Sequence, residues 1–336
     1  MIFSSCYWIG SAVISAASLY IFNGDKVPEQ YGWRIPFAFC AVFGVFIIIL
    51  RSFIPESPRF LLSKNRIAEA EAIVSRIERS VIKSESSHLI QDLGEPVRIH
   101  IKQKSLVETG KVLIKFYKSR AVLAAVLMTS QAFIFNAIFS SYTKVLHHDY
   151  NVPDEQFGYY LLPFTIVNFL GSASIGLVID KLGRIFTISS CFSVAGTLLC
   201  ITGYLYNIKY FSVTTQTVAW VCCFFFASAS GSSAYLSIAE LFPSKIRASS
   251  ISFFYSFGTL LGSVGPSFFG YLMDLDASES SRRHLMVGYF IAGGSAILAG
   301  ILETVWGIEC AGKSLEELEI QVDRNSPPLR SESPEV

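Results

Sequence analysis

The stretch Asp180-Lys181-Leu182-Gly183-Arg184 is a short charged segment between two long apolar runs. The runs are Phe157–Ile179 before it and Ile185–Tyr206 after it. Each run is long enough to cross a bilayer as a helix, which takes about 20 residues. The sequence therefore predicts a tight helical hairpin at a membrane surface. Its two basic residues predict that this surface is the cytoplasmic one.

The composition also indicates a membrane protein. Of the 336 residues, 51% are hydrophobic and 16% are charged, against about 25% charged in soluble domains. The net charge of +1 excludes the basic surface of a nucleic-acid-binding protein. The seven cysteines lie almost wholly in apolar runs and form no spaced metal-ligand set. We therefore expect no metal and no cofactor. With no catalytic Ser/His/Asp set or phosphate-binding loop in the sequence, we also expect no enzyme activity.

Eight apolar runs predict an all-α polytopic membrane protein with about eight transmembrane helices. The predicted spans are Ile2–Phe22, Ile35–Leu50, Ala121–Tyr142, Phe157–Ile179, Ile185–Tyr206, Thr214–Ala239, Ser250–Met273 and Leu285–Trp306. A long polar loop follows the second span, and its residues Asn65–Arg79 have the apolar spacing of an amphipathic helix. If this loop and the tail are cytoplasmic, the short inner turns carry the expected basic residues.

Four segments, in order along the chain, resemble motifs of the major facilitator superfamily of secondary transporters. They are Pro55-Glu56-Ser57-Pro58-Arg59, Asp180-Lys181-Leu182-Gly183-Arg184, Glu240-Leu241-Phe242-Pro243-Ser244-Lys245-Ile246-Arg247, and Gly312-Lys313-Ser314-Leu315-Glu316-Glu317. The segments Gln131–Phe139 and Tyr160–Phe164 resemble a proton-linked metabolite symporter branch of sugar or aromatic-acid transporters. The resemblance implies a twelve-helix fold in two halves, and the eight spans here match helices five to twelve.

The resemblance also implies a domain organisation. Residues 1–54 would hold the last two helices of the N-terminal bundle, and residues 55–119 a cytoplasmic loop. Residues 120–306 would form the C-terminal six-helix bundle, followed by a partly disordered cytoplasmic tail, 307–336, with a short helix at Ser314–Ile320. The first four helices of the family have no counterpart here. A fragment, a gene interrupted by a mutation and a wrong start codon are the three alternatives that would explain this.

The charged inner turns are candidates for a gate. Asp180 lies near the C-terminal end of its helix, where the helix dipole disfavours an anion, so a cationic partner is expected. The resemblance implies a cytoplasmic ion-pair cluster made of Asp180, Arg184, Glu240 and Arg247. The alternative is that these charges merely solvate the helix ends.

Polar residues inside the spans are candidates for substrate contacts, because such side chains are costly in lipid unless they face a cavity or a neighbouring helix. Gln131 and Asn136 lie five residues apart, hence about 140° apart around their helix, so one can face the cavity while the other bonds to a neighbour. The resemblance adds Asn168, Tyr235 and Tyr255 as cavity residues. Interhelical hydrogen bonds are the alternative for all five.

Small residues mark expected close contacts between helices. The run Ala227–Ala234 is almost entirely small, and Gly258, Gly262 and Gly265 precede Pro266. Such residues let helices approach and bend, as rocking transporters require. No Asp, Glu, Lys, Arg or His lies deep in a span, and Glu303, near the end of the last span, is expected at the membrane interface.

The function implied by the resemblance is alternating-access transport of a small organic metabolite (a sugar, an organic acid or an aromatic acid), proton-coupled in the family. The alternative is a non-transporting remnant, or a partner subunit that needs a missing N-terminal half in trans. The expected partners are the small-molecule substrate and the lipid bilayer, with no nucleic acid. The expected location is the plasma (inner) membrane.

Overall fold

The computed structural model describes residues 2–22, 29–32, 34–82, 106–153, 156–242, 244–274 and 280–309. Every regular element within these residues is a helix. The chain forms two compact units, one of Met1–Val27 with Ser105–Val336 and the other of Pro28–Lys104. The predicted domain of residues 1–54 therefore includes parts of both units. The predicted tail helix Ser314–Ile320 lies outside the described residues.

The smaller unit contains an apolar helix whose surface is uncovered. Its elements are α2 (Glu29–Gly32), α3 (Arg34–Arg51), α4 (Pro58–Ser63) and α5 (Ile67–Ile82). Helix α3 matches the predicted second span, and none of its described residues is buried. A helix that is apolar on all sides belongs in a membrane or a protein core. Within its own unit, α3 therefore leaves its apolar surface for lipid or for other helices.

Helices α4 and α5 form a compact pair after the Pro55–Arg59 segment. Pro58 is the first residue of α4, where its fixed φ suits a helix start and its missing N–H costs nothing. Asn65, at a φ of 58°, turns the chain between the two helices. Leu61 and Ala70 are buried, so the pair has a small core. The predicted amphipathic helix is confirmed, with observed bounds Ile67–Ile82.

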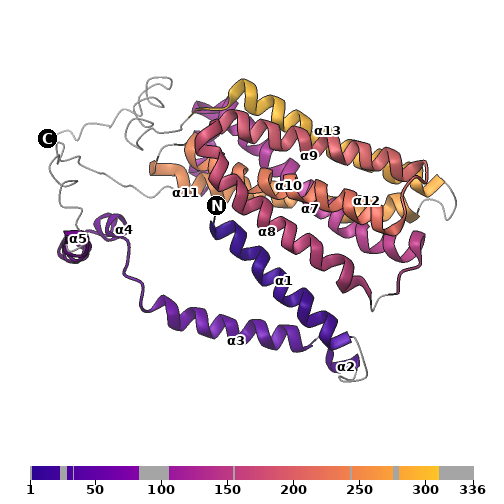
Figure 1. The fold of residues 1–336 in the computed structure, drawn as a ribbon. Coiled ribbons are helices and arrows are strands. Elements are labelled where there is room, and N and C mark those ends of the chain that lie inside the picture. Colours follow the sequence, from indigo (N-terminus) through magenta and orange to yellow (C-terminus); the bar gives the residue numbers. More distant parts are fainter. Residues whose placement is uncertain are drawn as a thin grey trace. The chain divides into compact units, whose positions relative to one another are not determined.

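The larger unit is a bundle of long helices (Figure 1). Its elements are α1 (Ile2–Phe22), α6 (Leu106–Phe116), α7 (Lys118–Tyr150), α8 (Phe157–Leu182), α9 (Arg184–Asn207), α10 (Val213–Leu241), α11 (Ser244–Gly262), α12 (Val264–Asp274) and α13 (Ser280–Trp306). Helix α9 packs on α13, α8 packs on α10 and α1, and α7 packs on α11. Because α7 to α10 run alternately up and down, the turn at Gly183 and the C-terminal ends of α10 and α13 lie at one end of the bundle. We call this end the inner end.

Glycines and serines bring neighbouring helices into close contact. A Cβ added at Gly196 in α9 would lie 2.4 Å from the carbonyl oxygen of Gly293 in α13. A Cβ added at Gly171 in α8 would lie 2.3 Å from the carbonyl oxygen of Phe225 in α10. The small-residue run of α10, residues 227–234, is buried throughout. These contacts confirm that small residues set the helix spacing, as expected in membrane bundles.

The predicted span Ser250–Met273 is broken into two helices. Helix α11 ends at Gly262 and α12 begins at Val264. Pro266 lacks the N–H that would bond to the carbonyl of Gly262, so an unbroken helix is disfavoured here. Six helices are long and apolar enough to cross a membrane: α3, α7, α8, α9, α10 and α13. The other two predicted spans are α1, whose described apolar stretch is Ser5–Ala17, and the broken pair α11 and α12.

Candidate functional site

The turn between α8 and α9 is a single glycine, so it lies where the sequence predicts but is shorter than the predicted five-residue turn Asp180–Arg184, because α8 continues to Leu182 and α9 begins at Arg184. Gly183 has a φ of 88° and a ψ of 156°, a backbone conformation that favours glycine. The hydroxyl of Thr187 donates to the carbonyl oxygen of Gly183 at 2.7 Å. Gly183 offers no side chain to cap the N-terminus of α9, so the first N–H groups of that helix need another acceptor.

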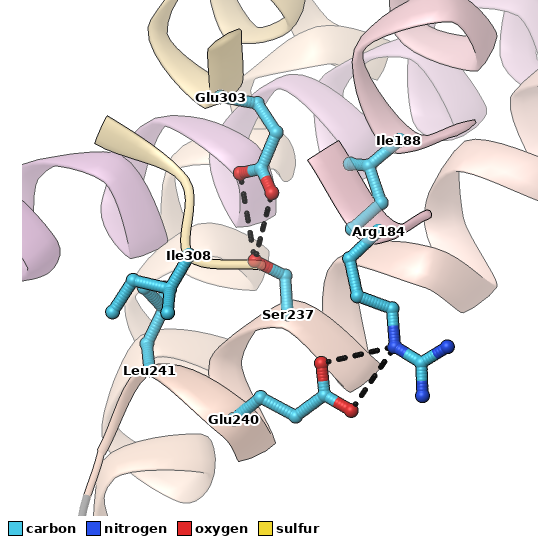
Figure 2. Close-up of a pocket in the computed structure, with 7 residues that line it drawn as sticks. All are labelled: Arg184, Ile188, Ser237, Glu240, Leu241, Glu303 and Ile308. Carbon is cyan, nitrogen blue, oxygen red and sulfur yellow. Dashed lines mark hydrogen bonds and ion pairs between the residues drawn. The ribbon is translucent and has the colours of Figure 1, made fainter. Parts of the chain in front are cut away.

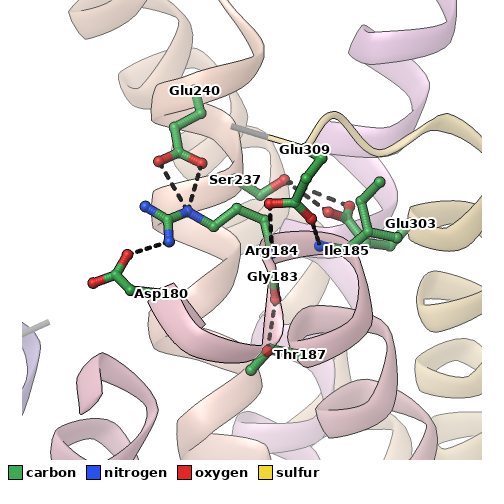
Figure 3. Close-up of polar contacts among 9 residues, drawn as sticks. All are labelled: Asp180, Gly183, Arg184, Ile185, Thr187, Ser237, Glu240, Glu303 and Glu309. Carbon is green, nitrogen blue, oxygen red and sulfur yellow. Dashed lines mark hydrogen bonds and ion pairs between the residues drawn. The ribbon is translucent and has the colours of Figure 1, made fainter. Parts of the chain in front are cut away.

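That acceptor is Glu309, which follows α13 (Figure 3). Its carboxylate accepts the backbone N–H of Arg184 at 2.9 Å and that of Ile185 at 3.3 Å. A carboxylate at a helix N-terminus is favoured both by these hydrogen bonds and by the helix dipole. Sequence reasoning missed Glu309 because its partners lie more than 120 residues away and no local pattern connects them. This contact ties the end of α13 to the start of α9.

Arg184 lies between two acidic side chains from different helices. Its Nη1 pairs with Asp180 of α8, and its Nε donates to Oε1 of Glu240 in α10 at 3.3 Å (Figure 3). The side chains of Arg184 and Glu240 are 13% and 16% exposed, whereas that of Asp180 is 70% exposed. The structure thus brings together three of the four predicted gate residues. The Arg184–Glu240 pair is therefore largely shielded from water, whereas the Arg184–Asp180 pair is exposed on its Asp180 side.

The fourth predicted gate residue, Arg247, is not joined to this cluster. It lies in the first turns of α11, and in the described part of the chain it forms no ion pair with Asp180 or Glu240. Its Nε is buried without a hydrogen-bond partner among the described residues. Helix α11 begins at Ser244, six residues before the predicted span, so Arg247 is part of a helix rather than of an inner turn.

Glu303 corrects an expectation from the sequence. It was placed at the membrane interface, but its side chain is 1% exposed and lines a pocket with Arg184, Ser237 and Glu240 (Figure 2). The hydroxyl of Ser237 donates to its two carboxyl oxygens at 3.4 and 3.5 Å. The expectation was wrong because a residue near a helix end can still face the bundle. Its environment then depends on which face α13 presents to α10.

The five predicted substrate residues are all in the bundle, and two of them touch each other. The rings of Tyr235 and Tyr255 lie 5.9 Å apart between centroids. Gln131 approaches the small-residue run of α10, because a Cβ at Gly231 would lie 3.1 Å from its Cγ. Asn136 is half-buried. In the part of the chain that the structure describes, no hydrogen bond joins any two of the five predicted side chains.

Asn168 has an unsatisfied acceptor. Its side chain is 1% exposed, and its Nδ2 donates to the carbonyl oxygen of Phe164 within α8 at 2.7 Å. Its Oδ1 is buried without a hydrogen-bond partner among the described residues. Buried polar atoms without partners are rare, and each is expected to have a reason. The amide of Asn168 therefore keeps one acceptor free.

A second charged cluster lies at the opposite end of the bundle, which we call the outer end. Arg282 of α13 pairs with Asp149 of α7 at 3.7 Å and lies 5.3 Å above the ring of Tyr206 in α9. The hydroxyl of Tyr206 donates to Asp149 Oδ2. The sequence did not predict this cluster, because α7 continues to Tyr150, eight residues beyond the predicted end. Asp149 and the adjacent His148 therefore belong to a helix and not to an outer loop.

Comparison with known proteins places this architecture in a family. A family model described as "Sugar (and other) transporter" matches residues 1–321. The chain belongs to this sugar transporter family. It is 25% identical over 346 residues to hexose transporter HXT13 of Saccharomyces cerevisiae, covering 93% of this chain and 56% of that protein. It is 22% identical over 303 residues to a D-xylose-proton symporter of Escherichia coli, covering 86% of this chain and 57% of that protein.

Solved structures of the sugar transporter family share the fold. The proton:xylose symporter XylE bound to 6-bromo-6-deoxy-D-glucose matches with a TM-score of 0.68 and 19% identity, covering 92% of this chain and 64% of that one. An inward-open xylose transporter XylE from E. coli matches with a TM-score of 0.56 and 18% identity. The chain spans little more than half the length of the curated relatives named above. It is an integral membrane protein of the major facilitator fold.

Proposed function

We propose that this protein moves a sugar across a membrane by alternating access, and that Asp180, Arg184 and Glu240 form a latch at the inner end. The observation that carries the proposal is the position of Arg184, which links α8, α9 and α10 through ion pairs. Ion pairs at helix ends can be exchanged during a movement without repacking an apolar core. Parting these helix ends would break the latch and open an inner path.

Sugars are the substrate class that the relatives support. Sugar hydroxyls donate and accept hydrogen bonds, and the free Oδ1 of Asn168 can accept one. The paired rings of Tyr235 and Tyr255 offer apolar faces and phenolic hydroxyls. Gln131 and Asn136 are the further proposed contacts. Because a named relative is a proton symporter, we include proton coupling in the proposal.

The proposed orientation places the inner end, the loop 55–119 and the tail in the cytoplasm, with the protein in the plasma (inner) membrane. Lys181 at the inner turn and Lys209 after α9 lie at opposite ends of the bundle. A membrane-impermeant maleimide applied to intact cells should label K209C but not K181C, each compared with the unmodified protein. Labelling of K181C alone would contradict the orientation.

A second candidate is that transport requires further helices, on the same or another polypeptide. The observation that favours it is α3, an apolar helix with no buried residue among those described. In this case the bundle described here would supply one part of a sugar path.

Uptake by the purified protein in liposomes tests the proposal. Wild-type protein should exchange labelled D-xylose or D-glucose across the bilayer. N168A should raise the half-saturating sugar concentration about tenfold, the effect of losing one hydrogen bond worth about 1.4 kcal/mol. N207A, at the end of α9, is the matched control and should behave as wild type. Folded protein that exchanges neither sugar would contradict the proposal for this chain alone and favour the second candidate.

A further inference from the structure

Among the residues that the structure describes, the buried carboxyl of Glu303 forms no ion pair. Its only hydrogen-bond partner in the described part of the chain is the neutral hydroxyl of Ser237, at 3.4 and 3.5 Å. Both distances exceed the 2.5 to 3.0 Å range that is usual for O–H···O bonds. An unpaired carboxylate removed from water costs several kcal/mol, whereas a protonated carboxyl does not carry that cost. The arrangement seen is therefore one that suits a protonated Glu303.

The backbone at Gly307 lies close to the Glu303 carboxyl. A Cβ added at Gly307 would lie 3.1 Å from Oε1 of Glu303 and 2.3 Å from its backbone oxygen. Apolar side chains of Ile188, Leu241 and Ile308 line the same pocket. Within the described residues, no group of three or more His, Cys, Asp or Glu is placed to hold a metal ion. A carboxyl enclosed in this way can still bind a proton.

The charged groups around Glu303 at the inner end come from several elements. Arg184 of α9 and Glu240 of α10 line the same pocket (Figure 2), and Glu309 follows on the same chain segment. Arg120 of α7 donates from Nη1 to the carbonyl oxygen of Leu241 at 3.2 Å. Arg184 is thus the cation within the pocket, and its charge is already shared between Asp180 and Glu240.

We propose that Glu303 is a proton-binding site, and that its deprotonation draws Arg184 away from Glu240 and so releases the inner latch. In this step the O–H bond of the carboxyl breaks, the proton passes to water at the inner end, and the carboxylate remains. The new anion then competes with Glu240 and Asp180 for one guanidinium. The gating consequence rests on the proposed latch function, whereas proton binding at Glu303 does not.

Infrared difference spectroscopy of the membrane-reconstituted protein tests proton binding directly. Exposed carboxyls are ionised above about pH 6, so a protonated-carboxyl C=O band that disappears between mildly acidic and alkaline buffer reports a buried group. We expect this band in wild type and its absence in E303Q. The matched control D149N removes a half-buried acid that already has a cation partner, and it should leave the band unchanged. S237A should keep the band but move it to higher wavenumber, because a hydrogen bond to the carboxyl is lost.

The outcomes are distinct. If E303Q does not fold, the S237A shift still assigns the band to Glu303. No band in wild type, or a band unchanged in both E303Q and S237A, would overturn the proposal.

Hydrogen exchange at the amides of Arg184 and Ile185 tests the gating step. Exchange corrected for the intrinsic effect of pH should rise at least tenfold in alkaline buffer in wild type but not in E303Q. An assigned band without that rise would overturn the release of the latch. Loss of sugar uptake with an assigned band would contradict only the transport function.

Discussion

The two ends of the bundle use charge in different ways. At the outer end one acid, Asp149, contacts Arg282, the ring of His148 and the hydroxyl of Tyr206. At the inner end one cation, Arg184, is close to Asp180 and Glu240 and shares a pocket with Glu303. The outer cluster has one acid surrounded by donors, so no second acid competes for Arg282 within it, and it acts as a fixed tie between α7, α9 and α13. The inner cluster has an excess of acids, so its one cation can change partners.

Removing the shared cation, Arg184, should have the largest effect of any substitution at the two ends. R184Q leaves Glu240, whose side chain is 16% exposed, without a counter-charge. Losing one partner of a fully buried pair costs about 3 kcal/mol or more, and because this pair is part-buried we expect a loss of about 2 to 3 kcal/mol. We expect a lower unfolding temperature in detergent and loss of sugar uptake. K181Q, at the adjacent turn position, is the control and should change neither measurement.

Breaking the outer tie should cost stability but leave the inner end unchanged. D149N removes the charge that faces Arg282 and weakens the acceptor for Tyr206, so the expected loss is about 2 kcal/mol. The measurement is denaturant or thermal unfolding of D149N and R282Q singly and together. A double mutant whose loss equals the sum of the single losses would show that the two groups do not interact.

The helix cap from Glu309 should contribute less than the ion pair. E309A removes the acceptor for the first N–H groups of α9, and loss of a cap costs about 1 kcal/mol. We expect a modest fall in unfolding temperature and faster hydrogen exchange in the first turn of α9. E309Q keeps a hydrogen-bond acceptor and should recover part of the loss. Equal effects of the two substitutions would mean that charge, and not hydrogen bonding, is what the cap supplies.

The exposed ion pair of the latch, between Arg184 and Asp180, should contribute least to stability. Asp180 is 70% exposed, and surface ion pairs contribute about 0 to 1 kcal/mol. D180N should therefore lower stability by no more than about 0.5 kcal/mol, and high salt should remove the difference. A loss of stability as large as that of R184Q would show that the shielded Glu240 is not the main partner of Arg184.

The sequence predicted what depends on local pattern. The glycine turn at Gly183 and the helices on both sides follow from apolar run length and a charged break. The bend at Pro266 was marked by its glycines, although a full break was not predicted. Glu303 and Glu309 escaped prediction because their roles depend on the face of α13 and on the path of the chain after it. Arg247 was grouped with the inner acids from motif order, and only the fold could show that α11 already contains it.

Hydrogen–deuterium exchange of the inner turn in R184Q and D149N tests the central contrast most directly. We expect at least tenfold faster exchange at the amides of Ile185 and Thr187, which are hydrogen-bonded in the first turn of α9, in R184Q, because the latch that holds the α8–α9 turn is gone. We expect no change at these amides in D149N, even though that variant is also destabilised. Equally faster exchange at the inner turn in both variants would show that the two ends open as one unit, which would contradict an independent inner latch.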